Sequence, residues 1–454
     1  MNDVPEAPEK AGTGGLRSIL RGAALAGLLQ VASYGLGYVL NFLLAHWLGA
    51  AQFGRYTYTI TVYSLLGLVA TAGFSASALK FIPQYRASDE RSAVRRYASN
   101  AQWTLLASGV GIALVLFVLL RTLPEYFGDY ADTLLYGLPL VLLMALVQFT
   151  SESLRAFGSV VKAYFASQVL RPVLVLGAVW AVLQTTDRVD ASEVVLVVVG
   201  AMLVVAVTQR QFLVGMLRAQ GAGGENTASA ERSLWWKISL SLLVISVLSA
   251  LLRQIDVVIL GWFVPTNEVG VYAIAVRLAT LCGLSLVLTN ILAAPGLLAL
   301  YSAGRLEDMQ VLASRLAHIV FWPALAVALV GGYFAHDILG LFGPEYPAAA
   351  PAMVVLMLGQ LVNVSVGPVG HLVDLTGNHR AGVYVRSFAL ALAIAMAVVL
   401  IPWIGILGAA FATATAMVVW NAALYIIVVR RVGLRPSIYD ALWALVRQRR
   451  IRGV

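Results

Sequence analysis

Long apolar segments separated by short polar stretches run through almost the whole chain. A hydrocarbon core about 30 Å thick requires roughly 20 apolar residues in an α-helix, and apolar segments of this length recur. The pattern therefore predicts an all-α polytopic membrane protein with about twelve transmembrane helices. Their expected spans are 23–48, 56–81, 99–121, 133–154, 161–184, 193–215, 238–263, 269–298, 312–335, 347–371, 381–401 and 405–429.

The composition supports a membrane protein. Of the 454 residues, 60% are hydrophobic and only 12% are charged. A typical soluble domain has about 25% charged residues and could not bury this many apolar side chains. The single cysteine, Cys282, lies in a predicted span and leaves no internal disulfide or cysteine-based metal site. Because no metal-binding or nucleotide-binding motif occurs, we expect no metal and no cofactor.

Lys and Arg are unequally distributed between the loops. Most of the 31 fall in the terminal segments or in loops that follow even-numbered spans, whereas the opposite loops contain only Arg55, Arg121 and Arg188. Since positively charged loops stay in the cytoplasm, we expect both termini to be cytoplasmic and the protein to lie in the cell (inner) membrane. The same distribution accounts for the net charge of +9 without a nucleic-acid partner.

The two ends of the chain differ from the spans. Residues 1–16 are rich in Pro, Gly and Ala and predict a disordered cytoplasmic tail before an uncleaved first helix. Residues 431–454 predict a basic amphipathic helix with Ser437 as its N-cap. Such a helix binds anionic membrane lipids at the interface, and binding to a partner is the alternative.

A weak internal repeat occurs at an offset near 216 residues. LGAAQFGRYTYT, residues 48–59, aligns with VPTNEVGVYAIA, residues 264–275, so that Gly54 matches Gly270. Because six spans separate the copies, both halves cross the membrane in the same direction, which predicts two parallel six-helix lobes around a central cavity. The expected organisation is an N-lobe over residues 17–216, a polar cytoplasmic linker over 217–235 and a C-lobe over 236–430.

Three charged residues lie deep inside predicted spans. Asp256 and Arg277 are each nine residues inward from the turn at Pro265 and Glu268, about 13 Å at the helical rise. Arg253 lies one turn deeper on the face of Asp256. A charge at such depth costs roughly 3 kcal/mol, so these groups should face one another or water. They form either an Asp256–Arg277 pair that locks two helices or a cavity wall with net positive charge.

A positive wall favours an anionic cargo. A guanidinium group binds phosphate oxygens in bidentate geometry, so a pyrophosphate is the expected anion. Arg171, Arg386 and Lys80 join this site only if their side chains turn inward, and Arg386 otherwise extends to the cytoplasmic headgroups. Three carboxylates could bind H+ or Na+ as a coupling ion: Asp256, Glu152 and Asp374. Each could instead pair with a basic residue.

Two stretches resemble a known superfamily. LGAAQFGRYTYT and DVVILGWFVPTNEVGVYAIAVRLATL resemble the first and seventh helix ends of the multidrug/oligosaccharidyl-lipid/polysaccharide (MOP) exporters, especially the polysaccharide and O-antigen flippase branch. The resemblance implies two six-helix lobes and the transfer of a polyprenyl-pyrophosphate-linked oligosaccharide from the inner to the outer leaflet, for surface polysaccharide such as lipopolysaccharide. YAIAVRL also resembles the stretch of lipid II flippases that carries a cavity arginine, here Arg277. However, VYSLLGLVATAGF lacks the arginine pair that those flippases carry in the second helix.

Other functions remain as alternatives. A drug or cation antiporter of the same superfamily would need an acidic, aromatic-lined cavity, yet Glu152 is the one near-membrane acid of the first six spans. A membrane glycosyltransferase or polymerase would need a large external loop with acid and base residues, so we expect no enzyme. Several polar residues inside the spans could bind sugar hydroxyls: Gln30, Tyr34, Asn41, Asn290, Gln360 and Asn363. They could instead form hydrogen bonds with neighbouring helices.

Overall fold

The computed structural model describes residues 13–186, 189–219 and 229–440, and this part of the chain contains helices and no strand. The first half comprises α1 (Thr13–Ala70), α2 (Phe74–Ala87), α3 (Arg91–Thr122), α4 (Ala131–Gly137), α5 (Pro139–Ala156), α6 (Val160–Tyr164), α7 (Arg171–Leu183) and α8 (Ala191–Arg218). The second half comprises α9 (Ser229–Phe263), α10 (Thr266–Thr280), α11 (Leu284–Ser302), α12 (Leu306–Tyr333), α13 (Ala335–Gly340), α14 (Ala350–Ser365), α15 (Val369–Leu375), α16 (His379–Ile404) and α17 (Ile406–Arg431).

The length and apolar character of these helices confirm a polytopic helical membrane protein. Among the described residues, nine helices can cross a membrane, or eleven if each of two bent pairs is one span. Twelve spans therefore remain a prediction. One reason is that α1 runs through the first two predicted spans, with a non-helical residue, Gly49, at φ 70° and ψ 169° between them. Glycine adopts this positive φ without a steric penalty.

Two further breaks bend predicted spans. Ala72 and Gly73 have positive φ values of 47° and 80°, and the helices on either side of them meet at 44°. Pro139 begins α5, and the helical pair over residues 128–156 is bent by 55°. Proline lacks the N–H that an uninterrupted helix would use at this point, so the axis changes direction there.

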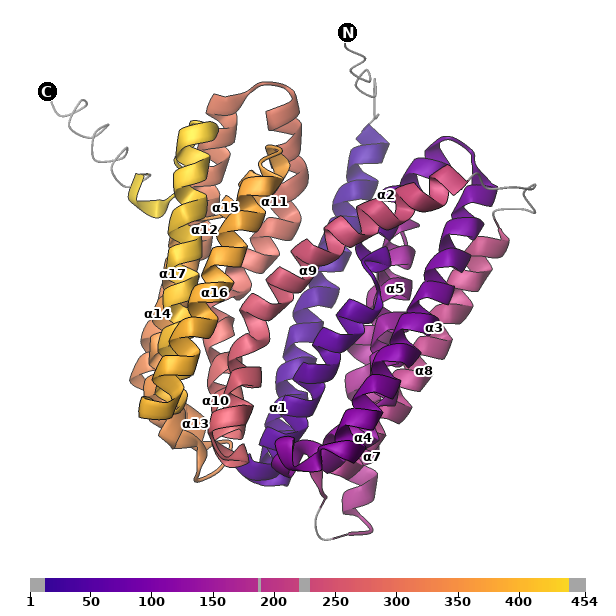
Figure 1. Cartoon of the computed structure of the whole chain (residues 1–454). Helices are drawn as coiled ribbons and strands as arrows, with labels where there is room; N and C mark the ends of the chain where they lie inside the picture. Colours follow the sequence, from indigo (N-terminus) through magenta and orange to yellow (C-terminus); the bar gives the residue numbers. More distant parts are fainter. Residues whose placement is uncertain (1–12, 187–188, 220–228, 441–454) are drawn as a thin grey trace, which may run out of the picture.

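The helices form two groups that meet along α1, α9 and α10 (Figure 1). In the first group α5 packs against α2, α3 and α8, and in the second α17 packs against α14 and α16. The first turn of α1, the ends of α8 and α17 and the start of α9 lie at the same end of the molecule (Figure 1). This end is the predicted cytoplasmic side.

At the opposite end, α1 and α10 touch through glycines. A Cβ atom added to Gly54 would lie 1.8 Å from the carbonyl oxygen of Thr266, and one added to Gly270 would lie 2.0 Å from that of Ala50. Ala50 corresponds to Thr266 at the 216-residue offset, just as Gly54 corresponds to Gly270. The contact is therefore reciprocal, as expected for two related halves that face each other. We call this contact the glycine seam.

Helix α9 belongs to both groups. Near its start, the Trp235 indole N–H donates to the Tyr85 hydroxyl at 2.8 Å, and the Ser239 and Ser77 hydroxyls lie 2.7 Å apart. Farther along, Leu252 packs against α16. The predicted C-lobe boundary at residue 236 therefore does not coincide with a change of packing partner, because the first turns of α9 pack on α2 and α3.

The expected terminal and linking segments lie partly outside the described residues. Of the predicted tail 1–16, residues 1–12 are not described, and α1 begins at Thr13. Residues 220–228 of the linker 217–235 and residues 441–454 of the C-terminal helix are also outside. At the start of that helix, the Ser437 hydroxyl accepts the Asp440 backbone N–H at 3.2 Å, as its predicted N-cap position requires.

Candidate functional site

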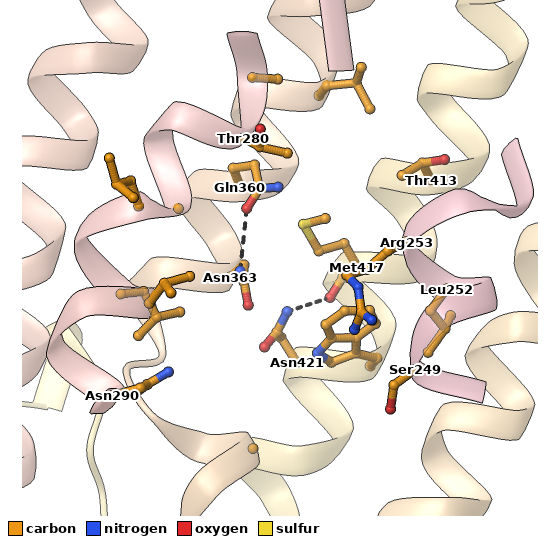
Figure 2. A pocket seen from close by; sticks show the side chains of 18 of the residues that line it. Ser249, Leu252, Arg253, Thr280, Asn290, Gln360, Asn363, Thr413, Met417 and Asn421 are labelled. Atoms are coloured by element: carbon orange, nitrogen blue, oxygen red, sulfur yellow. Dashed lines mark hydrogen bonds between the residues drawn. The ribbon is translucent and has the colours of Figure 1, made fainter. Parts of the chain in front are cut away.

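A cavity of about 860 Å³ lies mainly within the second half of the chain. Helices α9, α10, α11, α14, α15, α16 and α17 line it, and α1 contributes Tyr34 and Tyr38. Its size is typical of small-molecule sites. Arg253 on α9 lies on one side of the cavity, across from Gln360 and Asn363 of α14 (Figure 2).

Asp256 lies against this cavity but is held by its neighbours. The residue is only 4% exposed. The carboxylate accepts hydrogen bonds from the Tyr272 hydroxyl at 2.7 Å, the Val257 backbone N–H at 2.9 Å and the Thr413 hydroxyl at 3.2 Å. These donors from α9, α10 and α17 satisfy a buried carboxylate without a basic partner. The Asp256–Arg277 pair, one of the two predicted arrangements, is not among the ion pairs of the described residues.

Arg253 and Arg277 line the cavity, and neither pairs with a carboxylate of the described residues. Arg253 is exposed, and Arg277 is partly buried. The backbone carbonyl of Arg277 accepts a hydrogen bond from the Tyr38 hydroxyl at 2.9 Å, which fixes α10 against α1. Tyr38 also lies 3.2 Å from the Thr280 hydroxyl. The two guanidinium groups therefore leave positive charge on the wall that no ion pair of the described residues neutralises.

The other predicted basic residues are placed differently. Arg171 does not line the cavity, but it lies close enough to interact electrostatically with Tyr56 and Arg277. It follows a π-helical segment, Phe165–Leu170, which changes the helical register just before it. Lys80 is exposed on α2, with its ammonium group 5.9 Å from the centre of the Phe81 ring, and it does not line the cavity.

Two of the predicted carboxylates pair with arginines. At the cavity, Arg386 Nη2 donates to Asp374 Oδ2 at 3.2 Å, with 15% of the arginine and 43% of the aspartate side chain exposed. Arg386 thus extends into the cavity lining rather than outward. In the first half, Glu152 accepts from Arg155 at 2.7 Å and lines a separate pocket of about 230 Å³. Within the described residues, no three His, Cys, Asp or Glu residues lie close enough to hold a metal ion.

Several cavity residues were not predicted from the sequence. Trp420 and Asn421 line the cavity from α17, and Thr413 from the same helix binds Asp256. All three lie in an apolar span where alanine and valine predominate. The sequence shows that these residues interrupt the apolar span, but it does not show that they face a cavity. Tyr38, which binds the backbone of Arg277, is similarly hidden among the aromatic residues of α1.

The fold of the described helices is that of solved membrane transporters of the MOP superfamily. Among solved structures, the chain is similar to a multidrug resistance MATE transporter of the MOP superfamily in its inward-facing conformation, at 15% identity and a TM-score of 0.71, over 87% of this chain and 92% of that one. It is also similar to the lipid II flippase MurJ in an inward closed conformation, at 13% identity and a TM-score of 0.68, over 89% and 87%. An outward-facing MATE transporter gives 16% identity and a TM-score of 0.65, over 95% and 96%.

The sequence itself assigns the family. A family model described as polysaccharide biosynthesis protein matches residues 19–294, more than half of the chain. The protein belongs to this polysaccharide biosynthesis protein family. The predicted superfamily is thus confirmed. A comparison with curated protein sequences gives no significant match.

Proposed function

We propose that this protein is a flippase that moves a polyprenyl-pyrophosphate-linked oligosaccharide from the inner to the outer leaflet for surface polysaccharide synthesis. The observation that carries the proposal is the pair of cavity arginines, Arg253 and Arg277, that have no acidic partner among the described residues. An uncompensated charge at membrane depth costs roughly 3 kcal/mol, which an anionic ligand offsets. Two guanidinium groups suit the several oxygens of a pyrophosphate.

The contacts at the two ends of the molecule support transport by alternating access. Near the predicted external end, the glycine seam brings the backbones of α1 and α10 together. The cavity lies farther inside, between helices of the second half and α1. Separation of the seam would expose this cavity to the opposite side of the membrane. We propose H+ or Na+ as the coupling ion, with Asp256, Glu152 and Asp374 as its candidate carboxylates.

A drug or cation antiporter is the second candidate, because the same fold occurs in MATE transporters. The charged residues of the cavity lining oppose it: Arg253, Arg277 and Arg386 outnumber Asp256 and Asp374. Both aspartates are also engaged in hydrogen bonds. A cationic drug would therefore meet a wall with excess positive charge. We do not propose a glycosyltransferase or polymerase activity.

The first experiment is Arg277→Lys, with Arg315→Lys as a matched control at an exposed position outside the cavity. Lysine keeps the charge but loses the planar fork, so one charge-assisted hydrogen bond is lost, and the affinity for pyrophosphate should fall by roughly 10-fold or more. Surface polysaccharide is measured in a flippase-deficient strain and normalised to the membrane level of each variant. Arg277→Lys should complement poorly at a normal protein level, while the control complements fully. Full activity of both Arg277→Lys and Arg277→Gln would refute phosphate binding by this residue.

A further inference from the structure

Five carboxamide side chains line the cavity: Gln254 from α9, Asn290 from α11, Gln360 and Asn363 from α14, and Asn421 from α17. Gln254 Oε1 accepts a hydrogen bond from the Ser64 hydroxyl of α1 at 2.7 Å, so it joins two helices. Asn363 Nδ2 donates to Gln360 Oε1 at 3.3 Å, and Asn421 Nδ2 donates to the Met417 carbonyl at 2.8 Å, each within one helix (Figure 2). Asn290 Oδ1 is buried without a hydrogen-bond partner in the described chain. Apart from Gln254, none of these amides bonds one helix to another through a hydrogen bond of the described residues.

The amides consequently retain unused hydrogen-bonding groups at the cavity. A carboxamide offers two N–H donors and one carbonyl oxygen with two lone pairs. Apart from the Gln254 bond, the contacts above use one donor of Asn363, one donor of Asn421 and the carbonyl oxygen of Gln360. Polar groups in a membrane protein usually bond neighbouring helices, or else bind a ligand or water in a cavity. Hydroxyl groups match such amides because each hydroxyl both donates and accepts.

An aromatic ring connects this wall to the arginines. Trp420 lines the cavity and packs in the same apolar cluster as Leu252, the residue before Arg253. An indole presents a flat apolar face that suits the C–H face of a sugar ring. The amides are uncharged, and the carboxylates of Asp256 and Asp374 are occupied by Tyr272 and Arg386. The site therefore combines neutral donors and acceptors with an aromatic face, next to a cationic group.

We infer that the carboxamide wall, formed by Asn290, Gln360, Asn363 and Asn421 with Trp420 beside it, binds a neutral pyranose. This sugar is the one attached directly to the pyrophosphate that Arg253 and Arg277 hold, so the inference rests on the proposed function. The arginines recognise the part of the cargo that all lipid-linked glycans share. The carboxamide wall recognises the first sugar and thus contributes selectivity among glycans.

The test measures affinity for lipid probes by isothermal titration calorimetry on the full-length protein in detergent. The probes are a ten-carbon prenyl diphosphate without sugar and the same lipid bearing a single glucosyl, galactosyl or N-acetylglucosaminyl group. The variants are Asn363→Leu and Asn421→Leu, which lie on different helices and keep the side-chain size. The matched control is Asn41→Leu on α1: Asn41 Nδ2 also donates to a carbonyl four residues earlier, that of Gly37, but Asn41 does not line the cavity.

At least one glycosylated probe should bind the wild-type protein more tightly than the sugar-free lipid. Each cavity variant should then lower the affinity for that probe by about 3- to 10-fold, the effect of one hydrogen bond, and leave the sugar-free affinity unchanged. The inference is overturned if no sugar adds affinity in the wild type, or if the folded variants weaken both kinds of probe equally. Failure of the proposed function gives a different result: the sugar-free lipid does not bind the wild type, or binds Arg277→Gln just as well.

Discussion

Gly270→Ala tests whether the glycine seam controls the conformational equilibrium. The added Cβ would lie 2.0 Å from the Ala50 carbonyl oxygen and 3.0 Å from the Gly54 backbone nitrogen. Cβ atoms do not approach other atoms closer than about 3.0 Å, so α1 and α10 must separate by about 1 Å. Overpacking of this kind costs about 1–3 kcal/mol. That cost acts only on the conformation with a closed seam, so the population ratio should shift about 5- to 150-fold toward the open one.

The shift can be measured as a distance between spin labels at the predicted external end. Glu125 and Glu345 are exposed on the two halves and can be replaced by cysteine after Cys282→Ala removes the buried native thiol. Gly200→Ala is the matched control, because a Cβ added at Gly200 on α8 meets no atom within 4 Å. Gly270→Ala should broaden or lengthen the distance distribution, whereas the control should keep the wild-type distribution.

The size of the effect can be checked at the partner glycine. Gly54→Ala places its Cβ 1.8 Å from the Thr266 carbonyl oxygen, so it should shift the distribution in the same direction and at least as far. Thermal unfolding of each purified variant separates a shifted equilibrium from a misfolded protein. Unchanged distances in a folded Gly270→Ala protein would show that the seam relaxes locally and does not control the equilibrium.

Three further predictions concern stability and topology. Asp256→Asn should lower the free energy of unfolding by about 1–3 kcal/mol because the Tyr272 hydroxyl donates to the carboxylate. When it is combined with Arg277→Gln, the two effects should add within about 0.5 kcal/mol. Strong coupling between them in a double-mutant cycle would instead reveal a helix-locking pair. Trp235→Phe removes the donor to Tyr85 and should lower the unfolding free energy by about 1 kcal/mol, with no further loss when Tyr85→Phe is added. Cysteine tags at both termini should react with a membrane-impermeant maleimide only after the cells are permeabilised, and labelling of either tag in intact cells would contradict the predicted orientation.

The fold followed from the sequence where length and polarity decide it. Apolar runs of membrane length predicted helices, whereas the depth of Asp256 and Arg277 in the membrane stays a prediction from the helical rise. Rotation about the helix axis did not follow, because it depends on neighbouring helices. Asp256 turns toward Tyr272 and Thr413, so it is satisfied there rather than by Arg277.

Irregular backbone limited the prediction in other places. The π-helical segment before Arg171 changes the direction of its side chain, and a regular helical projection cannot anticipate it. The resemblance supplied the superfamily, which the family match and the shared fold confirm. The carboxamide wall was invisible as a unit, since its members come from three helices that only tertiary packing brings together.

The sharing of α9 between the two groups has a consequence for the design of hybrid proteins. An exchange of halves between relatives would most simply be joined in the segment between α8 and α9. That junction would set a foreign Trp235 and Ser239 against the native Tyr85 and Ser77, so hydrogen bonds at 2.8 and 2.7 Å would depend on residues from two parents. A crossover beyond Ser239, near Leu252, would transfer the cavity-facing part of α9 with its own helices and leave this contact intact.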